Sequence, residues 1–154
     1  MAARGIDWKG FPMFRGEFIH NMDTKGRIVM PAKFREGLGT SFIITRGMDK
    51  CILAYTMSAW ASIEAKTSQL PLTDRDARRF LRYFIGGANE AEPDAQGRFV
   101  IPQPLREHAN LKKDIVSIGL TNRIEIWGKE NWDEYNTQNN FDDALAEKMS
   151  QLGI

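Results

Sequence analysis

The sequence has few of the residues that make covalent or metal sites. It contains one cysteine, Cys51, and two histidines, His20 and His108, in 154 residues. A single cysteine excludes an intrachain disulfide and any zinc site built on several cysteines. Cys51 lies in the apolar run CILAY, so we expect it to be a buried small hydrophobe in a strand. Neither histidine has a neighbouring nucleophile pattern, so we expect both to be structural or surface residues.

Several motifs are also missing. No run approaches the roughly 18 apolar residues of a membrane helix, and the opening MAARGIDWKGFP has no apolar stretch of the kind a signal peptide needs. A Gly-rich phosphate loop, HExxH and metal-ligand spacings are absent. The sequence therefore predicts a cytoplasmic protein with no metal, cofactor or membrane partner. An enzyme would need a convergent acid–base pair, which the sequence does not offer.

The charge is unevenly distributed. The net charge of the chain is +1, but residues 129–154 hold six acidic side chains and two lysines, a net charge of −4. Residues 1–128 therefore carry +5, so a basic body precedes an acidic tail. DNA binding depends on a local basic surface and not on the bulk isoelectric point. With 42% hydrophobic and 27% charged residues, the composition is that of one ordinary globular domain.

One sequence element occurs twice. Residues 23–31 read DTKGRIVMP and residues 94–102 read DAQGRFVIP. The identities extend on both sides at an offset of 71 and then 72 residues, which indicates an internal duplication. The identical pairs are Gly16/Gly87, Asp23/Asp94, Gly26/Gly97, Arg27/Arg98, Val29/Val100, Pro31/Pro102, Arg35/Arg106, Glu36/Glu107, Ile43/Ile115, Gly47/Gly119, Ile52/Ile124 and Trp60/Trp132.

Each half predicts the order strand, strand, helix, strand, strand, helix. The fold class is therefore α+β, mainly β, with pseudo-twofold symmetry and hairpins of one half completing the sheet of the other in a small barrel or sandwich. In the first half we expect Ser58 to be the N-cap of the second helix. The predicted strands are 16–21, 27–30, 41–47, 51–55, 87–92, 98–101, 114–119 and 123–127, and the predicted helices are 32–38, 58–67, 104–109 and 129–138.

The stretch between the halves, LPLTDRDARRFLRYFIGG, predicts an amphipathic helix. Thr73 and Asp76 resemble a capping box. Four arginines fall at helical spacing on the face opposite an apolar stripe. We favour a solvated or subunit-facing role for this arginine face, and an auxiliary phosphate-binding face is the alternative. The arginines are Arg75, Arg78, Arg79 and Arg82, and the stripe is Ala77, Phe80, Leu81 and Phe84.

The repeated D-x-x-G-R element combines turn chemistry with a charge at the exit of the turn. Asp and Gly are explained by a tight turn, in which Asp bonds the backbone ahead and Gly accepts positive φ. An Asp–Arg bridge that only stiffens a hairpin is the structural interpretation. The functional one is a rigid turn that presents Lys25 and Arg27 to phosphates or to base edges. Two copies in one pseudo-symmetric unit favour the functional interpretation.

Three segments, residues 13–39, 71–109 and 122–135, resemble the MraZ family of bacterial transcriptional regulators, and the similarity covers residues 13–154. The resemblance implies two AbrB-like swapped-hairpin repeats in one chain and assembly into a ring-shaped homo-oligomer. It also implies a nucleoid-associated protein that binds double-stranded DNA at direct repeats upstream of division and cell-wall genes.

The family's D-x-x-x-R motif, which is associated with DNA binding, falls on Asp23 with Arg27 and on Asp94 with Arg98. With the residues inside each turn, Lys25, Gly26, Gln96 and Gly97, these form the candidate DNA-binding set. Gln96 stands where the first copy has Lys25, so the resemblance leaves open whether the two turns contribute equally. The alternative function is a ring-forming interaction module that binds acidic protein partners without DNA specificity.

The expected organisation has five parts. They are an N-terminal extension without an assigned function at 1–12, a first repeat at 13–67, the connecting helix at 68–85, a second repeat at 86–137 and a C-terminal helix at 138–154. Apolar residues at helical spacing in the last part predict that it packs on its own or a neighbouring subunit. They are Phe141, Leu145, Met149 and Leu152.

Overall fold

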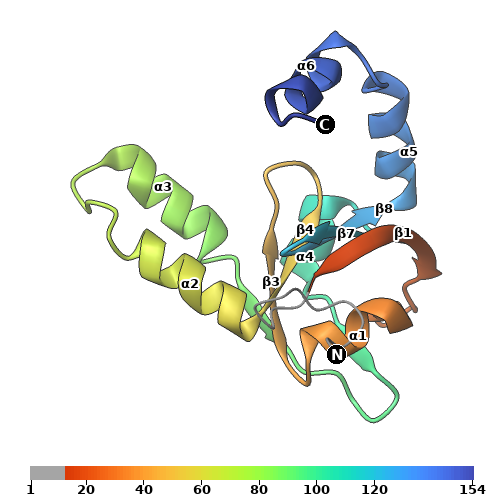
Figure 1. The fold of residues 1–154 in the computed structure, drawn as a ribbon. Helices are drawn as coiled ribbons and strands as arrows, with labels where there is room; N and C mark the ends of the chain where they lie inside the picture. Colours follow the sequence, from red (N-terminus) through yellow and green to blue (C-terminus); the bar gives the residue numbers. More distant parts are fainter. Residues whose placement is uncertain (1–12) are drawn as a thin grey trace, which may run out of the picture.

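The computed structural model describes residues 13–154, so the expected extension at 1–12 lies outside the described residues. Figure 1 shows the elements in chain order. The first half contains β1 (Phe14–Asn21), β2 (Arg27–Val29), α1 (Ala32–Leu38), β3 (Phe42–Arg46), β4 (Ile52–Thr56) and α2 (Met57–Thr67). After α3 (Arg75–Phe84), the second half contains β5 (Asn89–Ala91), β6 (Arg98–Val100), α4 (Gln103–Ala109), β7 (Asp114–Thr121), β8 (Ile124–Gly128) and α5 (Lys129–Gln138), and α6 (Asp143–Gln151) follows.

The two halves exchange strands. Six strands form one antiparallel sheet in the order β1-β7-β8-β4-β3-β5. The first strand of each half therefore pairs with the third strand of the other half, β1 with β7 and β5 with β3. Exchanging the halves reproduces the same order, which confirms the expected interlacing. The closed barrel is not shown, because the ladders leave β1 and β5 as edges.

A separate two-stranded ribbon joins the halves a second time. In it β2 pairs antiparallel with β6, so Arg27 lies opposite Val100, Ile28 opposite Phe99, and Val29 opposite Arg98. Side chains alternate along a strand, and Ile28 and Phe99 turn inward with 1% and 3% of their surface exposed. The ring of Phe99 packs edge-to-face on Phe42 of β3, with ring centroids 5.0 Å apart. Apolar burial thus anchors the ribbon to the main sheet by its inner face.

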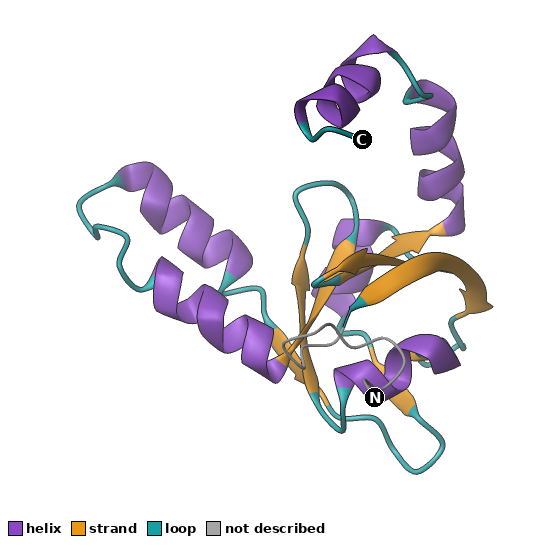
Figure 2. Ribbon diagram, in the orientation of Figure 1, coloured by secondary structure: helices purple, strands orange, loops and turns teal. Residues whose placement is uncertain are grey.

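Two short helices, α1 and α4, lie beside the strands (Figures 1 and 2). Helices α1 and α4 each begin after a proline, Pro31 and Pro102, whose fixed φ suits a helix start. Their inner faces bury Phe34 and Leu105 in the same core as the ribbon. The duplicated Val-x-Pro sequence therefore ends each ribbon strand and starts the helix that follows it.

Two predicted helix caps are wrong by one or two residues. The side chain of Thr56 caps α2 by accepting a hydrogen bond from Ala59 N at 3.1 Å, so Ser58 lies inside the helix. At α3 the cap is Asp74, whose Oδ1 accepts from Asp76 N at 3.0 Å, and not Thr73. In both helices the cap is the residue immediately before the first helical residue, from which a side-chain oxygen can reach the free N–H groups of the first turn.

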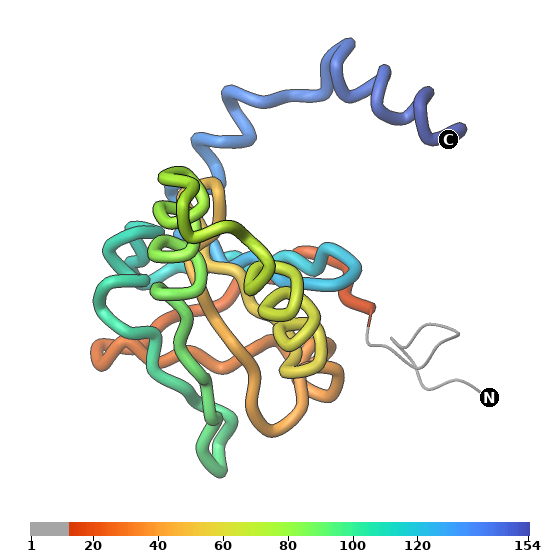
Figure 3. Tube along the Cα trace, turned by 90° about the vertical axis from the view of Figure 1, so that its left-hand side faces the viewer, coloured from red at the N-terminus to blue at the C-terminus, as the bar shows by residue number. Residues whose placement is uncertain are grey.

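Two helical arms extend from the sheet, α2 with α3 on one side and α5 with α6 on another (Figures 1 and 3). Phe84 packs α3 against Trp60 of α2, with ring centroids 5.4 Å apart. Helix α6 buries none of its residues, and Phe141 and Leu152 are 69% and 74% exposed. Packing of this helix on its own subunit is therefore not observed. Among residues 13–154, no helix is long and apolar enough to cross a membrane.

The ribbon register predicts unequal effects of two adjacent substitutions in β6. Phe99→Ala should lower the free energy of unfolding by about 3–5 kcal/mol, because it leaves a cavity under the ribbon. Val100→Ala should change it by less than about 0.5 kcal/mol, because Val100 points outward and is 53% exposed. Urea unfolding followed by tryptophan fluorescence measures both. Similar losses for the two variants would contradict the assigned faces of the ribbon.

Candidate nucleic-acid interface

The first D-x-x-G-R turn is held by one carboxylate. Asp23 Oδ1 accepts hydrogen bonds from the backbone N–H of Lys25 at 2.9 Å and of Arg27 at 2.8 Å. Its other oxygen, Oδ2, accepts from Arg27 Nε at 2.7 Å. Gly26 has φ +75°, a conformation that costs a side chain energy. The aspartate therefore fixes the backbone of the turn and the guanidinium of Arg27 together.

The second turn repeats this geometry with one difference. Asp94 Oδ1 accepts from the backbone N–H of Gln96 and of Arg98, both at 2.9 Å, and Oδ2 accepts from Arg98 Nε at 3.0 Å. Gln96 Oε1 also accepts from Arg98 Nη2 at 3.3 Å. At the corresponding place the first turn has the exposed Lys25. The second turn therefore has one cation fewer, and part of its arginine is engaged by a neutral amide.

Both carboxylates are kept ionised. The pKa values of Asp23 and Asp94 lie below the ordinary value, chiefly because the backbone N–H of Arg27 or Arg98 donates to each carboxylate. A carboxyl group whose pKa is lower in the folded than in the unfolded protein stabilises the folded protein at pH values above its unfolded-state pKa. This stabilisation is lost as the pH falls through the folded-state pKa. That window lies below about pH 4. At neutral pH both aspartates are therefore ionised.

The ribbon brings Arg27 and Arg98 onto one surface. Arg27 faces Val100, and Arg98 faces Val29, and these four residues share the side of the ribbon opposite Ile28 and Phe99. Arg27 and Arg98 are thus diagonal neighbours, a relation that corresponds to about 7–8 Å between residues in a regular pair of strands. The two turns themselves lie at opposite ends of the ribbon, so Lys25 and Gln96 are kept apart.

This arrangement suits the groove of a nucleic acid. A two-stranded β-ribbon is narrow enough to enter the major groove of B-DNA. An Arg fork can bind guanine O6 and N7 or a phosphate. Because each arginine is already oriented by an aspartate, less side-chain freedom is lost on binding than for a free arginine.

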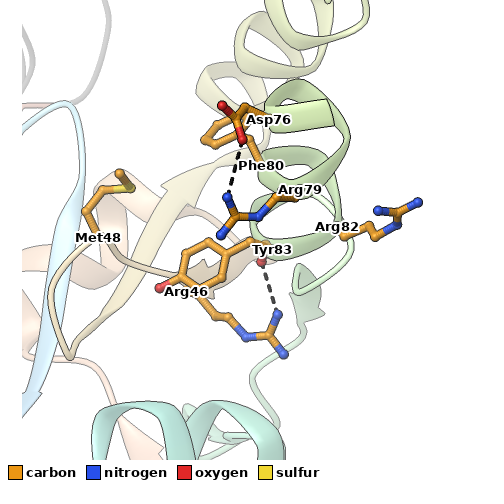
Figure 4. Close-up of a pocket in the computed structure, with 7 residues that line it drawn as sticks. All are labelled: Arg46, Met48, Asp76, Arg79, Phe80, Arg82 and Tyr83. Atoms are coloured by element: carbon orange, nitrogen blue, oxygen red, sulfur yellow. Dashed lines mark hydrogen bonds and ion pairs between the residues drawn. The ribbon is translucent and has the colours of Figure 1, made fainter. Parts of the chain in front are cut away.

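The arginine helix has a different surface, shown in Figure 4. A cavity of about 720 Å³ lies between α3 and the β3–β4 turn. Arg46 of β3 stacks 5.5 Å from the ring centroid of Tyr83 and donates to Tyr83 O at 3.3 Å. Arg79 pairs with Asp76 at 3.3 Å. Arg82 points away from these groups in the figure.

The structure does not gather the four predicted arginines of α3 into one cluster. Arg79 and Arg82 line the cavity. Arg78 turns back and donates to Leu72 O at 2.8 Å, and Arg75 is exposed at the start of the helix. Sequence reasoning missed Arg46, because it comes from a strand of the first half and its position depends on how α3 packs. The apolar stripe is borne out in part, since Ala77 and Phe84 are buried.

The fold and the site together define a duplicated protein whose two halves exchange strands. Its ribbon carries one arginine from each turn, and each arginine is paired with an aspartate. A family model described as "MraZ protein, putative antitoxin-like" matches residues 13–83 and 84–152. The proteins named "Transcriptional regulator MraZ" from Clostridium tetani and Acetivibrio thermocellus are 55% and 50% identical to the chain, over 92% of its length and 100% of theirs. The chain belongs to the MraZ family, as the sequence resemblance predicted.

The hydrogen bonds in the turns predict how the two aspartates titrate. In Arg27→Ala the pKa of Asp23 should rise only partway to its ordinary value, because the backbone N–H of residue 27 still donates to the carboxylate. The pKa of Asp94 should not change in this variant. Carboxyl carbon chemical shifts followed by NMR between about pH 2 and 6 measure both groups. A full return of Asp23 to the ordinary value would show that the side-chain pair, and not the backbone, holds the turn.

Proposed function

We propose that this protein is a sequence-specific, double-stranded DNA-binding regulator of transcription. The observation that carries the proposal is the ribbon register, which puts Arg27 and Arg98 on one outward face with each arginine oriented by an aspartate. The names of the relatives support a regulator of transcription. The proposed targets are direct repeats upstream of division and cell-wall genes, as the family resemblance implies, and the proposed location is the cytoplasm at the nucleoid.

A single ribbon is a small binding surface. DNA affinity rises steeply with the number of phosphates that a protein neutralises, and one ribbon offers only the few cations of its two turns. We therefore propose a ring-shaped homo-oligomer that places several ribbons on tandem sites. Linking weak sites in this way raises the overall affinity without new contacts, provided that the spacing fits the repeats.

Replacing the ribbon arginines tests the proposal. Arg27→Ala should weaken binding to a promoter fragment by tenfold or more, because it removes a charged contact worth about 1.5–3 kcal/mol. Arg98→Ala should weaken binding by the same amount or less. The second turn has Gln96 in place of Lys25, so we expect this turn to contribute less to DNA binding. Gel shifts on genomic fragments selected by the wild-type protein measure both variants.

Thermal unfolding should show that both variants remain folded, because the two arginines are surface residues with 26% and 38% of their side chains exposed. Wild-type affinity in both variants would refute the proposed site. Binding that shows no sequence preference on a double-stranded library would favour the alternative, a ring-forming module for acidic protein partners.

We assign the arginine helix to a subunit interface and not to DNA. Its cavity is lined by Met48 from the β3–β4 turn and by Phe80 from α3, with Arg46 next to Tyr83, and mixed apolar and arginine surfaces are typical of protein interfaces. Met48 is 81% exposed in the single chain. Burial of Met48 requires an apolar partner surface, which a phosphate backbone would not provide.

A double substitution separates the two roles of α3. Arg79→Gln with Arg82→Gln should reduce the oligomer mass measured by light scattering. The salt dependence of DNA binding per protomer should not change, because no phosphate contact is lost. An unchanged mass with a shallower salt dependence would assign the helix to DNA instead.

A further inference from the structure

Two arginines outside the D-x-x-G-R motif lie against its turns. Arg106 of α4 and Arg35 of α1 occupy equivalent places in the two halves. A Cβ atom built on Gly26 would lie 2.7 Å from Arg106 Cζ and closer still to its Nη1. A Cβ atom on Gly97 would lie 3.5 Å from Arg35 Nη1. Each turn is therefore accompanied by an arginine that the other half of the chain supplies.

Strand exchange explains how Arg106 reaches the first turn. Strand β6 runs antiparallel to β2, so its last residue, Val100, faces Arg27 at the exit of that turn. The next residue, Ile101, donates its backbone N–H to Gly26 O at 2.8 Å. Helix α4 begins two residues later, and Arg106 lies on its second turn. The guanidinium is thereby laid over Gly26, which is buried although it belongs to a surface turn.

Within the described residues, these two arginines have no acidic partner. Among residues 13–154, neither Arg35 nor Arg106 forms an ion pair within 4.0 Å. Arg106 Nε is buried without a hydrogen-bond partner in this part of the chain. Its acidic neighbour Glu107 accepts a hydrogen bond from Gln103 Nε2 at 3.0 Å. An arginine without an acidic partner, placed against the turn that carries Lys25 and Arg27, is suited to bind an anion.

We propose that Arg106 is a phosphate-binding residue of the first turn and that Arg35 has the same role, more loosely, at the second turn. The ligand is the DNA backbone, so this inference rests on the proposed function. Each half of the chain then supplies a turn for one site and an arginine for the other, and neither site is complete without both halves. The first turn gathers Lys25, Arg27 and Arg106, while the second has only Arg98 and Arg35, so the first is the stronger phosphate site.

The salt dependence of binding tests this role. Each phosphate contact contributes about 0.9 to the slope of log K against log salt for B-DNA. Arg106→Gln should therefore reduce the slope by about 0.9 for each bound protomer and weaken binding about tenfold. Arg35→Gln, on an exposed site, should reduce the slope in the same direction by a smaller amount. Sequence preference should not change in either variant.

Two controls separate a phosphate contact from a structural role. Arg106→Lys keeps the charge and should retain the wild-type slope. Arg123→Gln removes an arginine from the β7–β8 turn. This turn lies next to the start of β1, whereas the first D-x-x-G-R turn follows the end of β1, so the variant should bind as wild type. Arg106→Gln with a wild-type slope would overturn the inference, whatever its affinity.

The glycines give an independent test. Ala at residue 26 should push the Arg106 guanidinium aside, whereas Ala at residue 97 meets Arg35 only at ordinary contact distance. Both glycines have positive φ, +75° and +80°, so the backbone strain is matched. Gly26→Ala should reduce the salt slope and Gly97→Ala should not. Equal slopes for the two variants would contradict the placement of Arg106.

Arg27→Gln in the same titration distinguishes failure of this inference from failure of the proposed function. If Arg27→Gln lowers affinity and Arg106→Gln leaves the slope unchanged, the turns bind DNA without Arg106 and only the inference fails. If neither substitution changes affinity or slope, the proposed DNA site fails as well.

Discussion

The pairing of each half with the other is the constraint on which the rest of this structure depends. The edge strands β1 and β5 find their partners in the opposite half, and the ribbon takes one strand from each. A short three-residue strand such as β2 or β6 is not stable alone. It is held in place because its partner strand comes from the other half and because residues of both halves form the core beneath it. The candidate binding face is thus a product of strand exchange and not of either repeat.

Within the ribbon, one chemical group performs two tasks in each turn. The aspartate satisfies backbone N–H groups that a tight turn leaves free, and it also orients the arginine that leaves the turn. An exposed ion pair by itself contributes little to stability, about 0–1 kcal/mol. The value of the Asp–Arg pair lies in holding the guanidinium in one direction before a ligand arrives. The cost of ordering is then met during folding instead of during binding.

The helix bounds and turns that depend on neighbouring residues could be predicted from the sequence. The bounds of α1 and α5 follow from the proline that precedes α1 and from helical spacing, and the two turns follow from Asp and Gly. Register and strand order could not be predicted, because they depend on contacts between residues about 45 to 107 positions apart in the sequence. For the same reason, the sequence showed Arg35 and Arg106 as an identical pair in the repeat, but it did not predict that they lie against the turn glycines. Caps such as Asp74 were missed because neighbouring Thr and Asp residues compete for the same N–H groups.

Duplication in one chain also permits the two halves to differ. A symmetric dimer of identical halves must carry two identical turns, whereas a fused pair can keep Lys25 in one turn and Gln96 in the other. Gln96 holds Arg98 by its amide, and Gly97 is less closely covered than Gly26. The second end of the ribbon therefore has one cation fewer and a less closely placed second arginine. A ribbon with one more basic end has a direction, and this direction is compatible with the direct repeats proposed above as targets, in which every copy faces the same way.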